Sequence, residues 1–229
     1  MKTKTDRITP MLACLLAATT WCASAGDAAK TTKTALEGPV RFAVISDPHL
    51  YNARLGTTGA AFERYLFGGD PKLIAESEAI LDSALARITE AGVRFMIVAG
   101  DLTKDGEVAD HVLMAQHLQK LQQAGIAVFV VPGNHDINNP LAATYLGDTT
   151  RPVPNTSPET FRALYQRFGY GKAIARDSGS LSYVAEPVPN LWLLAIDSCK
   201  YQDNLQLGTP VIGGRLSPET MTWILTRLQ

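Results

Sequence analysis

Three short segments of the chain combine carboxylate, imidazole and amide side chains directly after apolar runs. They are Asp47-Pro48-His49, Gly100-Asp101 and Gly133-Asn134-His135-Asp136. Oxygen and imidazole donors without thiolates suit divalent Mn, Fe, Zn or Mg, and they argue against a closed structural zinc site. The residue types therefore predict a metal site, provided that the fold brings the three segments together.

The apolar runs before these segments predict buried β-strands over residues 40–46, 94–99 and 126–131. Between them, helical spacing predicts one helix that Asp70 caps and Gly92 ends, and a second over residues 107–123. A β–α–β–α–β order implies parallel strands joined by right-handed crossovers. Their carboxyl ends lie at one edge of a sheet, so the three polar segments should converge there.

Each segment also has an ordinary interpretation when it is taken alone. Asp47 could be a turn residue, Gly100-Asp101 a turn into a helix, and Asn134-His135-Asp136 a capping cluster. Because all three follow β-rich runs in the same order, the shared metal site is the interpretation we favour.

The three segments together are similar to the calcineurin-like metallophosphoesterase superfamily, over about residues 40–136. The stretch from Gly100 to Gly106 resembles the branch with class III cyclic-nucleotide phosphodiesterases. It differs from purple acid phosphatases, which carry a metal-binding Tyr where this chain has Lys104. The resemblance implies an α/β fold, a four-layer αββα sandwich of mixed β-sheets flanked by helices, with its C-terminal part missing.

The resemblance also implies two divalent metal ions and assigns their ligands. Asp47 and His49 would hold one ion, Asn134 the other, and Asp101 would bridge them. A carboxylate can bridge cations that lie about 4 Å apart, and two cations activate water as a hydroxide near neutral pH. The expected activity is therefore hydrolysis of a phosphodiester or phosphomonoester.

The remaining candidate residues would act on the substrate. By the same resemblance, His135 would contact the phosphate and protonate the leaving oxygen, and Asp136 would orient it. Arg54 and Lys104 are weaker candidates for substrate contact. The alternatives are a histidine bonded within its own turn for His135, an ordinary surface arginine for Arg54, and a solvated turn for Lys104.

The first 25 residues resemble a secretory signal peptide. Lys2, Lys4 and Arg7 form a basic start, an apolar stretch follows over residues 11–18, and small residues favour cleavage after Ala25. The apolar stretch is too short to span a bilayer. We therefore expect a periplasmic or secreted protein without a stable membrane anchor, and an uncleaved N-terminal anchor is the alternative.

The rest of the chain predicts a linker and one domain. Residues 26–38 are small and polar and predict a disordered linker, and residues 39–229 predict the incomplete metallophosphoesterase domain. The formal net charge of −1 gives no reason to expect a nucleic-acid partner. The expected partner is a small-molecule phosphoester.

Outside the three segments the predictions are coarser. Residues 50–70 read as a long loop that could cover a substrate, with one helical turn over 60–66. Residues 137–179 read as loops with a short helix opened by Ser157. A hairpin is predicted over 181–185 and 191–196, and a last helix is predicted at the end of the chain, over 220–228.

The later histidines that this superfamily uses to close its site have no match here. The four histidines are His49, His111, His117 and His135. Because His111 and His117 are six residues apart on the second predicted helix, we expect them on a solvated surface. We expect the missing ligands beyond residue 229 and weak metal binding by this chain alone. A non-catalytic binding module is the alternative function, and a nuclease is a weaker one.

Overall fold

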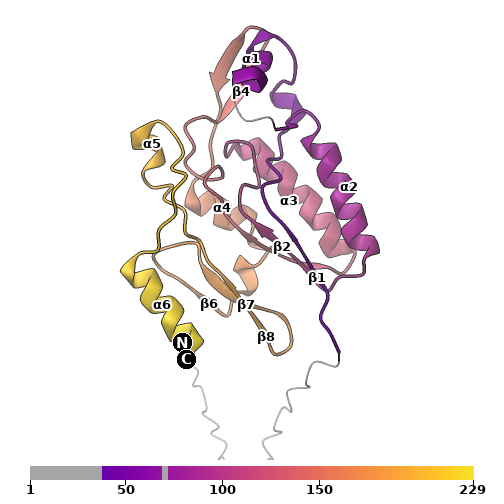
Figure 1. Cartoon of the computed structure of the whole chain (residues 1–229), viewed down its shortest axis with the longest axis vertical. Coiled ribbons are helices and arrows are strands. Elements are labelled where there is room, and N and C mark those ends of the chain that lie inside the picture. The colour runs from indigo at the N-terminus through magenta and orange to yellow at the C-terminus, as the bar shows by residue number, and fades with distance from the viewer. Residues whose placement is uncertain (1–37, 69–71) are drawn as a thin grey trace, which may run out of the picture. The chain divides into compact units, whose positions relative to one another are not determined.

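The computed structural model describes residues 38–68 and 72–229. The predicted signal peptide and residues 26–37 of the predicted linker lie outside the described residues, as do Asp70 and its neighbour Pro71. Parallel and antiparallel sheets are flanked by helices (Figure 1), which confirms the predicted mixed α/β class and is consistent with a calcineurin-like sandwich.

The three predicted strands form one parallel sheet in the order β1-β2-β3. They are β1 (Phe42–Ile45), β2 (Phe95–Ala99) and β3 (Ala127–Val131). The middle strand β2 pairs with a neighbour on each side, and its Met96 and Val98 are fully buried. All three strands run in the same direction, so their carboxyl ends meet at one edge as predicted.

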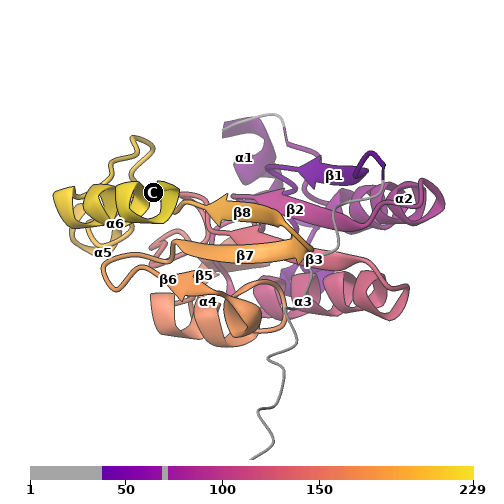
Figure 2. The same ribbon diagram turned by 90° about the horizontal axis from the view of Figure 1, so that it is seen from below.

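Two long helices connect these strands and pack against each other: α2 (Ser77–Glu90) and α3 (Val108–Gln123). Figure 2 shows both on the same side of the parallel sheet. The prediction that α2 starts at Asp70 is wrong, because residues 72–76 are not helical. Ser77 instead starts the helix with its buried hydroxyl accepting a hydrogen bond from the Tyr51 amide at 3.0 Å.

The prediction that His111 and His117 lie on a solvated surface is also wrong, because they are 0% and 2% exposed. His117 faces α2, where its ring nitrogens lie 3.0 Å from Glu78 and 2.8 Å from Asp82. His111 lies 2.8 Å from the Tyr165 hydroxyl, which comes from the far side of α3. Helix α3 is thus covered on two sides, and residues six apart can both be buried.

Residues 51–68 and 143–152 form a small unit of their own, which we call the aromatic unit (top of Figure 1). Tyr51, Phe62 and Tyr145 pack in its centre. The predicted helical turn is a nine-residue helix, and the hairpin across residues 143–152 was not predicted. The elements of the unit are η1 (Ala53–Leu55), α1 (Ala60–Gly68), β4 (Ala143–Leu146) and β5 (Thr149–Pro152).

A second sheet, antiparallel, follows in the order β6-β7-β8. Its strands are β6 (Ala175–Arg176), β7 (Tyr183–Val188) and β8 (Leu191–Ala195), so the predicted hairpin is confirmed. The Tyr183 hydroxyl donates to the Val130 carbonyl at 2.9 Å and ties this sheet to β3.

Two further helices begin where the sequence places Ser-Pro-Glu. Ser157 caps α4 (Pro158–Leu164) and Ser217 caps α6 (Pro218–Leu228), each accepting a backbone amide three residues ahead. Short elements η2 (Tyr170–Lys172) and α5 (Asn204–Leu207) complete the described chain. None of the helices in residues 38–68 and 72–229 combines the length and apolar character that crossing a membrane requires.

Candidate metal centre

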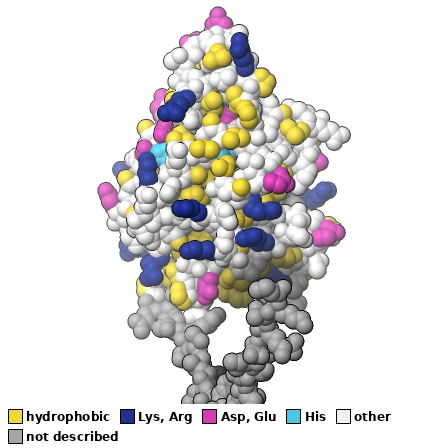
Figure 3. Space-filling model, turned by 180° about the vertical axis from the view of Figure 1, so that it is seen from behind, with side chains coloured by type: hydrophobic (Ala, Val, Ile, Leu, Met, Phe, Trp, Pro, Cys, Tyr) yellow, Lys and Arg dark blue, Asp and Glu magenta, His cyan; other side chains and the backbone are white. Residues whose placement is uncertain are grey.

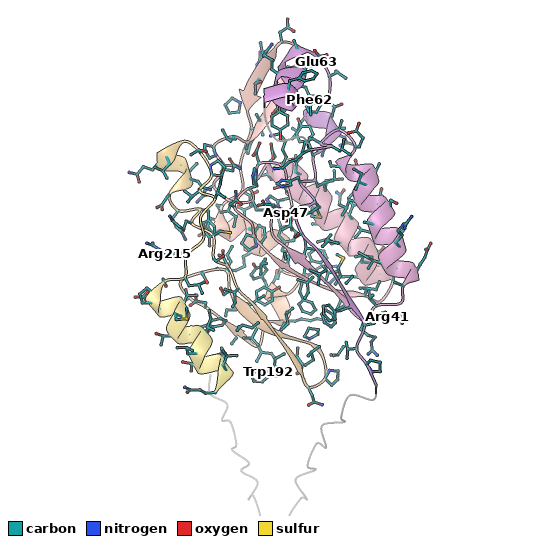
Figure 4. The ribbon with its side chains drawn as sticks, viewed as in Figure 1. Arg41, Asp47, Phe62, Glu63, Trp192 and Arg215 are labelled. Carbon is teal, nitrogen blue, oxygen red and sulfur yellow. The ribbon has the colours of Figure 1, made fainter. Side chains whose placement is uncertain are left out.

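The three polar segments converge at the carboxyl ends of β1, β2 and β3. The Asp47 amide donates to the Gly100 carbonyl and the His49 amide to the Asp101 carbonyl, both at 3.1 Å. The His135 amide donates to Asp101 Oδ1 at 2.9 Å and joins the third segment to the second. Figure 4 shows Asp47 among side chains gathered where these strands end. Asp101 therefore contacts both of the other segments, through its carbonyl to His49 and through its side chain to His135.

The side chains themselves lie at distances that suit a cation. His49 Nε2 is 3.8 Å from Asp101 Oδ2 and 4.0 Å from Asp47 Oδ1. Each of His49, Asp101 and His135 offers one ligand atom, and these atoms all lie within 4.8 Å of one another. Asn134 lines the same cavity as Asp47 and Asp101, with a volume of about 370 Å³. Bonds of about 2.0–2.2 Å from such donors can meet at one ion.

Two further features distinguish this site: a buried nitrogen without a hydrogen-bond partner among the described residues, and a strained backbone. His49 is 7% exposed, and its Nδ1 has no hydrogen-bond partner among the described residues, which is costly for a buried nitrogen. Asp47, His49 and Asp101 have φ angles of 53°, 41° and 47°, a left-handed conformation that residues other than glycine rarely adopt. Such strain gathers at functional sites. The donor set fits a divalent cation.

Two glycines allow the second and third segments to approach. A Cβ on Gly133 would lie 2.1 Å from the Asp101 amide nitrogen, so only glycine fits there. Gly100 has a φ of 89°, and a Cβ added to it would lie 3.1 Å from Gly133 Cα. The glycines in Gly100-Asp101 and Gly133-Asn134 are thus required by close packing of two backbones.

Asp136 does not orient His135, which corrects the role implied by the resemblance. Its carboxylate is fully buried and accepts the amides of Gly133 at 2.7 Å, Thr103 at 3.0 Å and Leu102 at 3.1 Å. The fold therefore uses Asp136 to fasten the loop after β3 to the loop after β2, behind the site.

His135 takes its orientation from the preceding loop instead. Its Nδ1 lies 2.7 Å from the Lys104 carbonyl and 3.0 Å from Asp105 Oδ1. A carbonyl oxygen can only accept, so Nδ1 carries the hydrogen and Nε2 is left for a ligand. Burial lowers the pKa of His135, but the hydrogen bond to Asp105 and the charge of Asp101 outweigh it and raise this pKa.

The contact of Asp105 with His135 was not predicted, and the place of Asp105 four residues after Asp101 in one loop was the available signal. Lys104, proposed as a substrate contact or a solvated turn, is neither: it is 1% exposed and pairs with Asp105 and with Glu107, the latter at 3.1 Å. Arg54 is exposed on η1 and lines a different cavity from that of Asp47.

One more side chain borders the site from the segment that follows β8. Cys199 lines the same cavity as Asp101 and Asn134, and its thiol donates to the Pro132 carbonyl at 3.5 Å. Burial, followed by the charge of Asp197, raises the pKa of Cys199 to about 12, so it stays a thiol at neutral pH.

Comparison with known proteins agrees with this geometry. A family model described as calcineurin-like phosphoesterase matches residues 40–201. The chain belongs to the calcineurin-like phosphoesterase family. Members of this family hydrolyse phosphoesters with divalent metals, and the His49–Asp101–His135 cluster has the residue types and spacing that could hold a metal ion.

A second comparison, with one known relative, covers only a short part of the chain. The chain is similar to a probable cyclic nucleotide phosphodiesterase of Vesicomyosocius okutanii subsp. Calyptogena okutanii (strain HA), with 32% identity over 65 residues. These residues make up 28% of this chain and 27% of that protein. The chain thus matches about a quarter of the relative's length.

Proposed function

We propose that this protein hydrolyses phosphodiesters or phosphomonoesters with two divalent metal ions. The observation that carries the proposal is the gathering of His49, Asp101 and His135 within 4.8 Å at the ends of parallel strands. The relative's name, a probable cyclic nucleotide phosphodiesterase, favours a small phosphodiester as the substrate.

The residues divide into metal ligands and a proton donor. Asp47, His49, Asp101 and Asn134 would hold the ions, which when bound supply Lewis acidity that activates water and neutralises phosphate charge. The fixed Nδ1–H of His135 leaves Nε2 to donate a proton to the leaving oxygen, and the raised pKa keeps that proton available near neutral pH.

Four ligands are too few for two cations that each take four or more donors. The proposal therefore includes further ligands from outside residues 1–229. It also includes a periplasmic or secreted location, supported by the basic and apolar pattern of the first 25 residues.

Two alternatives remain distinct from this proposal. A non-catalytic module would bind metal through the same side chains without turnover. A nuclease would need a continuous basic surface, whereas uncharged and hydrophobic side chains separate the Lys and Arg side chains on the face drawn in Figure 3.

The test is turnover of bis-p-nitrophenyl phosphate and p-nitrophenyl phosphate by the full chain with Mn²⁺, Fe²⁺, Zn²⁺ or Mg²⁺, beside calorimetric metal binding. We expect Asp101→Asn to lose at least about 100-fold in kcat/KM. Asp148→Asn, an exposed carboxylate on the β4–β5 turn, is the matched control and should keep wild-type rates. Metal binding without turnover would support the binding module instead.

A further inference from the structure

Lys104 is enclosed by aromatic rings of the aromatic unit. Its Nζ lies 4.8 Å from the ring centre of Tyr65, 5.6 Å from that of Tyr145 and 5.7 Å from that of Tyr51. These rings come from α1, from β4 and from the segment after β1, so residues far apart in sequence meet at one ammonium group. Cation–π attraction holds such a group best when it is desolvated, as it is here.

The same ammonium group holds two carboxylates. Lys104 Nζ pairs with Asp105 and Glu107, and Glu107 Oε2 also accepts the Asp105 amide at 2.8 Å. Burial lowers the pKa of Lys104, but the charges of Glu107 and then Asp105 outweigh it, so the pKa is raised and the cation persists. Asp105 thus has its position set from the side opposite the metal site.

The position of Asp105 in turn determines its hydrogen bond with His135. Its Oδ1 lies 3.0 Å from His135 Nδ1 and accepts from Asn139 Nδ2 at 3.2 Å. We propose that Lys104 is a positioning residue that couples the aromatic unit to His135 through Asp105. The aromatic unit then controls how firmly Nδ1 holds its hydrogen, and hence how Nε2 is presented at the site.

An ion pair kept only for stability does not explain this arrangement. Buried ion pairs are weak contributors to stability compared with apolar side chains of the same volume. A ring cage restricts the position of the ammonium group further than carboxylates alone would, because it adds contacts to Nζ beyond the two ion pairs. A fixed position for Asp105 affects His135, because the His135 ring is hydrogen-bonded to the Asp105 carboxylate.

The first experiment is ¹⁵N-histidine NMR of the metal-free full chain at alkaline pH, where imidazoles are neutral. The whole sequence has four histidines, so each ring can be assigned. We expect His135 to give the Nδ1–H tautomer in the wild type, and its ring signals to shift in Lys104→Met, where the backbone carbonyl of residue 104 still accepts from Nδ1 but Asp105 is displaced. Lys120→Met, whose side chain is 63% exposed and pairs with Asp82, should leave the His135 signals unchanged.

A second variant covers the case in which Lys104→Met does not fold. Tyr65→Leu removes the nearest ring without uncovering either carboxylate, and should shift the His135 signals in the same direction. Phe67→Leu is its control on the same helix, because Phe67 is 87% exposed. His135 signals in Tyr65→Leu that match the wild type would overturn the proposal.

The catalytic consequence rests on the proposed function and has its own readout. If Lys104 acts through His135, its loss matters most when the leaving oxygen needs a proton. We expect kcat for an alkyl phosphoester to fall about tenfold more than kcat for a p-nitrophenyl ester in Lys104→Met or Tyr65→Leu, with KM little changed. Equal losses on both esters would contradict the coupling, whereas no wild-type turnover would refute the proposed function and leave the NMR result to judge the coupling.

Discussion

The edge of the parallel sheet and the cage around Lys104 differ in how far their polar groups are exposed and paired. At the edge, the Asp47 side chain is 62% exposed and the buried Nδ1 of His49 has no described partner. In the cage, Lys104 is 1% exposed and its ammonium group contacts two carboxylates and three rings. Open polarity at the edge suits a ligand, and paired polarity in the cage fixes positions.

The largest effect on stability should come from breaking the cage. Lys104→Met keeps the volume but leaves Asp105 and Glu107 buried without their cation. We expect a loss of about 3–5 kcal/mol in the free energy of unfolding, measured by urea denaturation. Lys120→Met, at the exposed pair with Asp82, should change it by less than about 1 kcal/mol. Equal losses of stability in the two variants would show that the buried pairs of Lys104 contribute no more than the exposed pair of Lys120.

The buried His111 should make the free energy of unfolding depend on pH. Burial lowers its pKa to about 4, although the hydrogen bond to the Asp136 carbonyl opposes this. Above pH 6.5 the ring is neutral in both states and its stabilisation is complete. As the pH falls toward 4, the unfolded chain takes up a proton that the native chain excludes, so up to about 3 kcal/mol is lost.

The check is urea denaturation at pH 7 and at pH 4.5 for the wild type and His111→Gln. The variant should lose less stability than the wild type between these two values, because it lacks the buried imidazole whose pKa is lowered. His117→Gln is the control on the same helix. A wild-type slope that survives in His111→Gln would assign the pH dependence to other groups.

The convergence of the site could be predicted because it depends on strand direction and order, which apolar runs and their connections reveal. The local geometry could not be predicted in this way. Asp47 and His49 both adopt the left-handed conformation, and Asp47 Oδ1 lies 4.0 Å from His49 Nε2. The order and direction of the strands determine which residues lie at the site. The directions of their side chains depend on strained backbone angles, which the sequence does not reveal.

The partners of His135 could not be predicted for a related reason. Asp136 is its neighbour in sequence, but the turn directs that carboxylate backwards to the amides of Gly133 and Leu102. Asp105 reaches the ring because the preceding loop folds over it. Likewise the rings around Lys104 come from residues 51, 65 and 145, and no local pattern connects such distant positions.

A smaller effect on stability should follow from crowding the edge of the sheet. Gly133→Ala places a Cβ 2.1 Å from the Asp101 amide nitrogen and forces the two loops apart. We expect a loss of about 1–3 kcal/mol in the free energy of unfolding, together with weaker Mn²⁺ binding by calorimetry because Asp101 moves. Gly125→Ala, with a φ of 84° and nothing within 4 Å of the new Cβ, should cost about 1 kcal/mol and leave Mn²⁺ binding unchanged.

The smallest effect on stability should come from Asp47, although it is central to the proposed chemistry. Its side chain is 62% exposed, and asparagine tolerates a φ of 53° as well as aspartate does. We expect Asp47→Asn to change the free energy of unfolding by less than about 0.5 kcal/mol and to weaken Mn²⁺ binding, since a charged ligand is lost. A large loss of stability would mean that the fold itself depends on this carboxylate, and the edge would then resemble the cage. An unchanged fold with impaired metal binding would show that the edge keeps its charge for a ligand.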